Sequence, residues 1–260
     1  MHNNDVSRFS PSSPDALKNK IILITGAGDG IGREAALTYA RYGAELLLTG
    51  RTESKLQAVR DEITQRYGSV PRIYHQDLLT LTEAQSRQFA AALEQEIPRL
   101  DGVLHNAGIL GVVAPITEQP VQLWQDVMQV NVNGTFILTQ ALLPLLLKSP
   151  QSSLVFTSSS VGREGRAAWG AYAVSKFATE GMMQVLAEEY KGTGLRVSCI
   201  NPGGTRTAMR AGAFPDEASE KLKTPADIMP TYLYVMCDDS AGKNGISYDA
   251  QPGRKAGPAE

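Results

Sequence analysis

Tyr172 and Lys176 place a phenol and an ammonium four residues apart in the segment Tyr172-Ala173-Val174-Ser175-Lys176. Residues at i and i+4 are neighbours on one face of a helix. A free tyrosine has a pKa of about 10, so about 4 kcal/mol must favour the phenolate before it titrates near neutral pH. A lysine ammonium about 4 Å away in a partly dry cleft could supply much of that free energy. The pair predicts a tuned general acid/base. The same spacing is also common on ordinary solvated helix faces. The rest of the chain must therefore decide between a general acid/base pair and a solvated surface pair.

A glycine turn follows a short β-branched run near the start of the chain. Residues 20–25 predict a buried parallel strand, glycines follow at positions 26, 30 and 32, and residues 33–42 predict a helix. Backbone N–H groups in such a turn, next to a helix N-terminus, can approach a pyrophosphate closely. The spacing differs from G-x-G-x-x-G. The alternative is a tight turn that needs glycine for its backbone alone.

Arg51 stands directly after the second predicted strand, residues 45–50. About 20 residues beyond such a glycine turn, an acidic residue would bind the 2′-hydroxyl of NAD, whereas an arginine accommodates the 2′-phosphate of NADP. Arg51 therefore favours NADP, against the alternative of a surface arginine before the helix predicted for residues 53–67. Asp77 follows a third predicted strand, residues 72–76, where a carboxylate could meet the adenine amine.

Strands and helices continue to alternate along the chain. Further strands are predicted at residues 101–105, 153–157, 195–200 and 245–250, and further helices at 81–96, 120–148, around Tyr172 and at 225–236. This order predicts an α/β fold, a single-domain doubly wound (Rossmann) parallel sheet of about seven strands with helices on both faces. We expect residues 1–18 to be a flexible N-terminal arm, 19–250 the domain and 251–260 a C-terminal tail.

Two local features refine this organisation. Asn131, Asn133 and Gly134 lie inside the helix predicted for residues 120–148, where each is unfavourable by up to about 1 kcal/mol, which predicts a kink or a close contact there. His105 ends a strand without a carboxylate partner in view, so we expect it to pack in the core rather than act as a base. Residues 208–223 lack a clean period and are interpreted as a mobile lid.

Composition excludes several classes of function. The formal net charge is -2, which provides no basic field for nucleic acid. The two cysteines, Cys199 and Cys237, lack metal-ligand spacing, so neither a zinc site nor a disulfide framework is expected. Residues 1–15 contain no apolar stretch typical of a signal peptide. The apolar run at 141–147 is short, contains Pro144 and predicts a buried helix segment rather than a membrane span. We expect a cytoplasmic protein with no nucleic-acid or membrane partner and no metal.

Several motifs occur together in one order along the chain, namely Thr25-Gly26-x-x-x-Gly30-x-Gly32, Asn106-Ala107-Gly108, Asn131, Ser159, Tyr172-x-x-x-Lys176 and Asn201-Pro202-Gly203. In this order they resemble the short-chain dehydrogenase/reductase family, from about Lys20 to about Ala250. The sequences of residues 203–210 and 249–254 resemble those of a subgroup of oxidoreductases from proteobacteria. The family more often has Asn-Asn-Ala-Gly where this chain has His105-Asn106-Ala107-Gly108, a departure that concerns strand packing.

The resemblance implies four catalytic residues. Tyr172 would exchange a proton with the substrate oxygen, and Lys176 would lower the pKa of Tyr172 and hold the nicotinamide ribose. Ser159 would donate a hydrogen bond to the substrate oxygen. Asn131 would hold a water that connects Lys176 to solvent. The family often carries a basic residue at the position of Asp29 when it prefers NADP, so that preference rests here on Arg51.

The resemblance also implies a nucleotide cofactor, NADP, with NAD possible. Thr205 and Thr207 would lie by the nicotinamide carboxamide and the pyrophosphate. The implied cofactor-binding residues are Gly26, Asp29, Gly30, Ile31, Gly32, Arg51, Asp77, Leu78, Asn106, Ala107, Gly108, Tyr172, Lys176, Pro202, Gly203, Thr205 and Thr207.

The expected activity is hydride transfer between NADP(H) and a small carbonyl or alcohol substrate, in a homodimer or homotetramer. One alternative is an NADP(H)-binding sensor or scaffold without useful turnover, and another is epimerisation or dehydration on the same scaffold. Arg163, Arg166, Arg206 and Arg210 favour an anionic substrate, although loop arginines are also commonly solvated.

Overall fold

The computed structural model describes residues 5–257, and within them seven strands form one parallel sheet. The strands are β1 (Ile21–Thr25), β2 (Glu45–Gly50), β3 (Arg72–His75), β4 (Gly102–His105), β5 (Ser152–Thr157), β6 (Leu195–Asn201) and β7 (Ile246–Asp249). The helices are α1 (Gly30–Arg41), α2 (Glu53–Tyr67), α3 (Glu83–Glu96), α4 (Val121–Met128), α5 (Thr135–Leu147), α6 (Gly170–Glu189), α7 (Ala208–Ala213) and α8 (Met229–Met236). Short 3₁₀ turns lie at Ile116–Glu118, Ser160–Gly162, Ser219–Lys221, Ala226–Ile228 and Asp238–Ser240.

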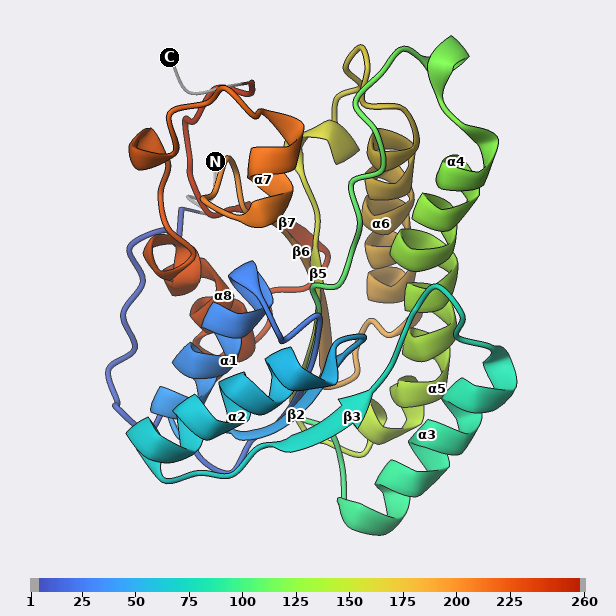
Figure 1. Cartoon of the computed structure of the whole chain (residues 1–260). Coiled ribbons are helices and arrows are strands. Elements are labelled where there is room, and N and C mark those ends of the chain that lie inside the picture. The colour runs from blue at the N-terminus through green and yellow to red at the C-terminus, as the bar shows by residue number, and fades with distance from the viewer. Residues whose placement is uncertain (1–4, 258–260) are drawn as a thin grey trace.

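Helices cover both faces of the sheet. Helices α1, α2 and α8 lie on one face, and α3, α4, α5 and α6 lie on the other (Figure 1). Each face has its own apolar core, and the strands contribute alternate residues to the two cores, as Ile22 and Ile24 do to one and Ile21 and Leu23 to the other. The inner strands are therefore buried on both faces, which explains their largely apolar sequences, whereas the edge strands β3 and β7 are only partly buried.

The strand order is β3-β2-β1-β4-β5-β6-β7. The chain runs outward from β1 to β3 and then crosses back to place β4 beside β1, so the direction of winding reverses between β1 and β4. At such a switch point the connections leave in opposite directions and a crevice opens beyond the carboxyl ends of the strands. This topology confirms the predicted doubly wound fold.

The conflict predicted inside the long helix is a π-helical segment, Gln129–Gly134, inserted between α4 and α5. A π turn lets one extra residue project from the helix and is frequent at functional sites. Gly134 closes this segment against the chain that follows β3, because a Cβ there would come within 2.7 Å of the Leu78 carbonyl oxygen. The glycine is thus required by close packing.

The continuous helical stretch Val121–Leu147 is apolar enough and long enough, by composition and length alone, to cross a membrane. In the fold it packs in the layer beside the sheet, and Leu138, Leu142, Leu145 and Leu146 belong to the core. Pro144 and the leucines around it are therefore part of a core helix, as the sequence predicted.

The chain on either side of the predicted domain packs onto it. Phe9 contacts Tyr234 edge to face, with ring centroids 5.1 Å apart, and Leu17 is fully buried. At the other end, Gln251 donates hydrogen bonds to the carbonyl oxygens of Pro202 (2.9 Å) and Gly204 (3.0 Å). The predicted division at residues 18 and 250 stays a prediction, and residues 1–4 and 258–260 of the arm and tail lie outside the described residues.

The predicted lid, residues 208–223, contains α7 and a 3₁₀ turn. Arg206 holds its far end, since its guanidinium donates to the carbonyl oxygens of Ser219 (2.8 Å) and Leu222 (3.2 Å). Thr205 and Lys223 form an isolated parallel bridge at the base. The segment is a closed loop that starts and ends at one point of the sheet, and its mobility stays a prediction.

Gly134→Ala tests the packing of the π-helical segment. The added methyl group would press on the Leu78 carbonyl oxygen, so we expect the free energy of unfolding to fall by about 1–3 kcal/mol. Gly165→Ala is the control, because nothing lies within 4 Å of a Cβ there and its φ is not positive. It should stay within about 0.5 kcal/mol of the parent protein. Urea denaturation measures both, and equal stability of the two variants would contradict the close contact.

Candidate active site

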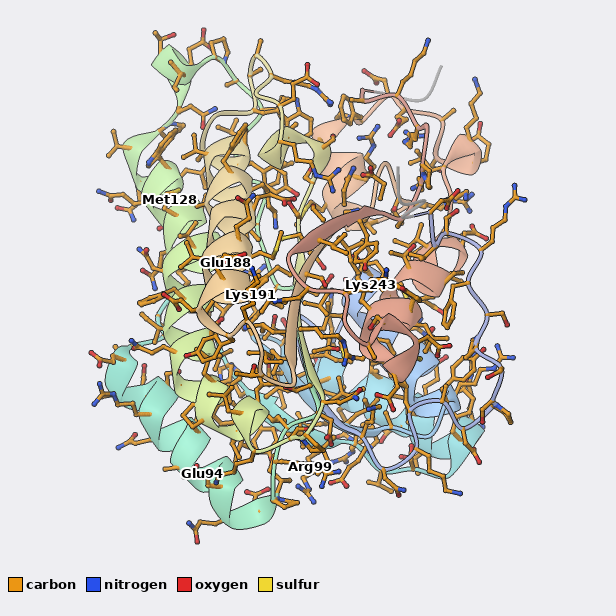
Figure 2. All side chains as sticks on the ribbon, turned by 180° about the vertical axis from the view of Figure 1, so that it is seen from behind. Glu94, Arg99, Met128, Glu188, Lys191 and Lys243 are labelled. Carbon is orange, nitrogen blue, oxygen red and sulfur yellow. The ribbon has the colours of Figure 1, made fainter. Side chains whose placement is uncertain are left out.

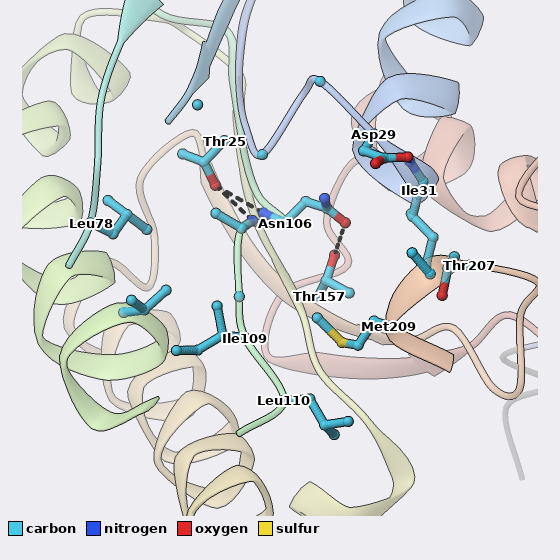
Figure 3. A pocket seen from close by; sticks show the side chains of 18 of the residues that line it. Thr25, Asp29, Ile31, Leu78, Asn106, Ile109, Leu110, Thr157, Thr207 and Met209 are labelled. Atoms are coloured by element: carbon cyan, nitrogen blue, oxygen red, sulfur yellow. Dashed lines mark hydrogen bonds between the residues drawn. The ribbon is translucent and has the colours of Figure 1, made fainter. Parts of the chain in front are cut away.

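A cavity of about 440 Å³ lies beyond the carboxyl ends of the strands, at the switch point. Its lining comes from the turn after β1, the segments after β2 to β6, the start of α6, and α7. In Figure 3, Asp29 and Ile31 at the start of α1 lie beside Thr207, and the chain after β4 carries Ile109 and Leu110. Segments from most of the chain therefore meet at one site.

Glycine is required in the turn for two different reasons. Gly26 and Gly30 have φ values of +65° and +52°, a region that residues with side chains adopt at a cost. Gly32 has ordinary geometry, but a Cβ there would lie 2.3 Å from the Gly26 carbonyl oxygen, so it lets α1 approach the turn. Gly32 does not line the cavity, and its place in the turn is explained by packing. Gly26, Gly28 and Gly30 line the cavity with backbone alone.

Asp29 begins α1. Its carboxylate accepts a hydrogen bond from the Gly30 N–H at 2.7 Å, which extends the helix predicted for residues 33–42 back to Gly30. The Lys55 ammonium donates to the same carboxylate at 2.5 Å and, as the largest cause, lowers the pKa of Asp29. Asp29 is therefore ionised and paired, and its charge does not stand alone at the helix N-terminus.

Arg51 and Lys55 place two cations at the end of the cavity near β2. The Arg51 guanidinium has no ion pair within residues 5–257, whereas Lys55 is paired to Asp29. Sequence reasoning missed Lys55. Its signal was its position one turn into the helix that follows Arg51.

A hydrogen-bonded chain connects the ends of the three central strands. The Thr25 hydroxyl on β1 accepts from the N–H groups of Asn106 (3.0 Å) and Ala107 (3.1 Å), which follow β4. The Thr157 hydroxyl on β5 donates to the Asn106 side-chain oxygen at 3.3 Å (Figure 3). Asp77 stabilises its own turn, since its carboxylate accepts from the Leu79 N–H at 3.0 Å. The floor of the cavity is thereby fixed.

Tyr172 and Lys176 lie on one face of α6 and both line the cavity. The Lys176 ammonium donates to the Thr157 carbonyl oxygen at 2.8 Å and lies 5.5 Å from the centroid of the Tyr172 ring. Burial raises the pKa of Tyr172 to about 12, and a hydrogen bond with Ser159 lowers it by less. Burial also lowers the pKa of Lys176 to about 8.

These electrostatics differ from the expectation that Lys176 would lower the pKa of Tyr172. Burial is the dominant influence on both groups, because it disfavours the charged form of each. The ammonium points at a backbone carbonyl and stands against the ring rather than at the phenolic oxygen. Tyr172 is a protonated phenol at neutral pH, as a free tyrosine also is.

Asn131 does not line the cavity and lies behind it. It is 3% exposed, its side-chain oxygen accepts from the Ile109 N–H at 2.8 Å, and its amide nitrogen donates to the Ile109 carbonyl oxygen at 2.9 Å. The same nitrogen donates to the Ser175 hydroxyl at 3.0 Å. Asn131 thus joins the chain after β4 to α6 at the turn that carries Tyr172. The water-holding role implied by the family stays a prediction.

Ser159 and Ser158 are separated by their surroundings. Both line the cavity, but the Ser158 hydroxyl is buried and has no hydrogen-bond partner in the described part of the chain. Ser159, in contrast, shares a hydrogen bond with Tyr172. His105 is buried, stacks on Phe156 with centroids 5.2 Å apart, and burial lowers its pKa to about 3. Its place in the core agrees with the prediction.

The segment after β6 closes the cavity from the side of α7. The Thr205 hydroxyl donates to the Pro202 carbonyl oxygen at 3.1 Å, and the Thr207 hydroxyl accepts from the Arg210 N–H at 3.1 Å to begin α7. Sequence reasoning missed Trp169 and Met209 in this wall. No pattern in the sequence marked them, because a single apolar side chain near a loop carries no period.

The structure brings the predicted residues together. The following predicted residues line the cavity: Gly26, Asp29, Gly30, Ile31, Arg51, Asp77, Leu78, Asn106, Ala107, Gly108, Ser159, Tyr172, Lys176, Pro202, Gly203, Thr205 and Thr207. Gly32 and Asn131 lie in the layer behind them. The role of each residue in binding or catalysis stays a prediction.

A sequence model of the family described as short chain dehydrogenase matches residues 20–218. The chain therefore belongs to the short-chain dehydrogenase family of oxidoreductases, as the motifs predicted. It is similar to the uncharacterized oxidoreductase YciK of Escherichia coli K12, with 67% identity over 94% of this chain and 96% of that protein.

Two solved structures support the same assignment. A short chain dehydrogenase from Shigella flexneri superposes with a TM-score of 0.96 at 64% identity, covering 98% of this chain and 99% of that one. A second, from Shigella flexneri 2a and complexed with NADP, has a TM-score of 0.91 at 65% identity and covers 92% of this chain and 100% of that one. The cavity thus belongs to a fold already seen with a nucleotide in a relative.

Lys176→Met tests the pKa of the buried lysine. The pKa of Lys176 is about 8 in the folded protein and lies near its ordinary value of 10.5 when unfolded. Between these values the unfolded state binds more protons, so stability should rise with pH by about 1 kcal/mol per unit relative to Lys176→Met. Urea denaturation from neutral pH to pH about 10 measures the difference. Lys243→Met, at an exposed lysine that does not line the cavity (labelled in Figure 2), should track the parent protein. A flat difference for Lys176→Met would contradict the lowered pKa.

Proposed function

We propose that this protein transfers hydride between NADP(H) and a small carbonyl or alcohol substrate, with Tyr172 as the general acid/base. The observation that carries the proposal is the meeting of Ser159, Tyr172 and Lys176 at one end of a cavity whose other end is an open glycine turn. Family membership supports the class of reaction. The nicotinamide, when bound, would supply or accept the hydride.

The cavity fits a dinucleotide at three points. The turn at Gly26 and Gly30 lines the cavity next to the start of α1, where a pyrophosphate binds well, and the Gly30 N–H is bonded to the Asp29 carboxylate. The adenosine ribose would lie beside the unpaired Arg51 guanidinium, and Asp77 lines the same part of the cavity. The cavity continues to Lys176 and Thr205 at the end where the nicotinamide would lie.

NADP is the proposed cofactor, with NAD as the less suitable one. Arg51 and Lys55 together can meet a 2′-phosphate with two cations, one free and one already paired to Asp29. Asp29 occupies a place where a basic residue would help NADP, but Lys55 neutralises its carboxylate. The related Shigella flexneri structure complexed with NADP supports the same choice.

The chain's own groups have separable roles in the proposed reaction. Ser159 would donate a hydrogen bond to the substrate oxygen and orient it toward Tyr172. The Tyr172 phenol, which is protonated at neutral pH, would give its proton to that oxygen during reduction. The Lys176 ammonium, 5.5 Å from the centroid of the ring, would stabilise the phenolate that remains and so offset part of the effect of burial on the pKa of Tyr172. Asn131 would keep α6 in place while this happens.

We also propose a cytoplasmic homodimer or homotetramer that acts on small molecules and has no nucleic-acid or membrane partner. The net charge of -2 supports the absence of a nucleic-acid surface. A sensor or scaffold would keep the nucleotide site without turnover, and the complete set of Ser159, Tyr172, Lys176 and Asn131 speaks against it.

Tyr172→Phe tests the acid/base. NADPH oxidation would be followed with a panel of ketones, aldehydes and quinones, and the variant should lose about 10²–10⁴-fold in kcat because the proton donor is gone. NADPH affinity should stay within about threefold, since the ring remains in place. Tyr190→Phe, at the end of α6 and outside the cavity, is the matched control. Tight NADPH binding with turnover unaffected by Tyr172→Phe would contradict the assignment, and binding without any turnover would favour a sensor.

Arg51→Ala tests the choice of cofactor. Loss of a charge-assisted contact to the 2′-phosphate should raise the Kd for NADPH about 10–100-fold and leave that for NADH unchanged. Arg60→Ala, on the helix that follows Arg51 but outside the cavity, should change neither. The two affinities can be measured by fluorescence titration. A parent protein that binds NADH more tightly than NADPH would contradict this role of Arg51.

A further inference from the structure

A second cavity of about 390 Å³ adjoins the first. The two share Ser159, Trp169, Gly203 and Arg210 in their linings. The second cavity includes neither the glycine turn nor Arg51, so it extends from the reacting serine away from the end where the nucleotide's ribose and pyrophosphate would lie. A ligand that occupies it and reaches Ser159 is on the substrate side of the site.

Charge distinguishes this cavity from the first. Its lining includes five cationic side chains, Arg163, Arg166, Arg210, Arg254 and Lys255, and two carboxylates, Glu164 and Asp249. A concave surface with one dominant sign of charge concentrates its potential inside the cavity and attracts ligands of opposite sign. The five cations differ in whether a carboxylate already pairs with them.

Two of the cations are already used to build the wall. Arg163 donates to Asp249 at 3.0 Å and lies 3.5 Å from Glu180, which is buried beneath the loop. Arg210 forms a bidentate pair with the buried Glu217, with both distances 2.6 Å. These pairs fix the cavity's shape, and their charges are largely balanced.

The remaining three cations are not balanced. Arg166 and Lys255 form no ion pair within residues 5–257. The Arg254 Nη2 atom is buried without a hydrogen bond and lies 3.8 Å from the Glu217 carboxylate, which Arg210 already engages. One carboxylate therefore faces two guanidinium groups. The exposed Glu164 is the one lining carboxylate with no cation paired to it in the described chain.

Arg206 is excluded from this set. Its guanidinium donates to the carbonyl oxygens of Ser219 and Leu222 and it does not line the cavity. Of the four arginines that the sequence singled out, Arg166 alone is both free and in the cavity. The C-terminal tail contributes Lys255, which the sequence did not single out. In Figure 1 the C-terminal segment runs beside α7 at this end of the molecule.

We propose that the second cavity binds an anionic group of the substrate, a carboxylate or a phosphate, against Arg166 and Lys255, while the substrate's carbonyl or hydroxyl lies at Ser159. The inference rests on the proposed hydride transfer for its reaction and on the cavity for its recognition. The substrate class is thus a small oxo acid, a hydroxy acid or a phosphorylated ketone or alcohol. Trp169, in the lining of both cavities, would pack against the carbon chain between the two groups.

The first measurement is NADPH-dependent reduction of matched pairs that differ only in charge. Straight-chain six-carbon oxo acids with the keto group at different positions would each be compared with their methyl esters. Dihydroxyacetone phosphate would be compared with dihydroxyacetone, which separates a phosphate site from a carboxylate site. In at least one pair the anion should have a kcat/KM about tenfold or more above its neutral partner, mainly through KM, because a charge-assisted contact acts on binding.

The variants Arg166→Gln and Lys255→Gln should each remove much of that preference and leave the neutral partner unaffected. Lys243→Gln is the matched control on a loop that lines neither cavity (Figure 2). A merely structural role would lower the activity on acid and ester alike. Equal kcat/KM values for every anion and its neutral partner, or a preference that survives both substitutions, would overturn the inference while leaving the proposed reaction intact.

Calorimetric titration separates recognition from turnover. The same pairs would be titrated into the protein with NADP⁺, with which a ketone cannot be reduced. Tighter binding of the anion, lost in Arg166→Gln and Lys255→Gln, would support the cavity even if no pair is turned over, in which case the proposed reaction fails and the site remains. Anion binding no tighter than that of the neutral partner would overturn the site.

Discussion

The amide of Asn131 holds together the parts of this molecule that must not move relative to one another. It uses its oxygen and its nitrogen on the two backbone groups of Ile109 and a further N–H on Ser175. These three contacts join the chain after β4, the π-helical segment and α6. Asn131 lies in the π-helical segment, a kind of irregularity that is frequent at functional sites. The local irregularity of the helix thus coincides with the contacts that tie the chain after β4 to α6.

Burial makes the resulting site electrostatically demanding. The phenol of Tyr172 and the ammonium of Lys176 are both pushed toward their neutral forms, in opposite directions of pKa. An ionised pair would be favourable only if the two charges appeared together, which happens when the phenol loses its proton beside the ammonium. Any stabilisation of the phenolate by the ammonium would lower the pKa of Tyr172, and burial is the larger influence on that pKa. The sequence alone could not show this, because spacing along a helix places the two groups but says nothing of the depth at which they lie.

The fold was predictable because its signals are local and repeated. Continuous apolar strands, turns with glycine and amphipathic helices alternate in a way that only a parallel sheet satisfies. The site residues were predictable as a set, since the carboxyl ends of parallel strands must meet. What the sequence did not reveal depends on contacts between distant segments. Gly32 proved to be a packing residue, Asn131 lies behind the cavity, and Lys55 reaches the cavity from a helix whose lysine no motif marked.

The C-terminal tail limits what the family model alone can say about function. The part of the chain that the family model matches ends at residue 218, whereas the wall that carries Gln251, Arg254 and Lys255 lies beyond it. The wall of the second cavity is therefore built from both parts of the chain, because Arg166 and Trp169 lie inside the matched range and Arg254 and Lys255 lie outside it. A match to the family model alone thus says nothing about the part of this wall that the tail supplies.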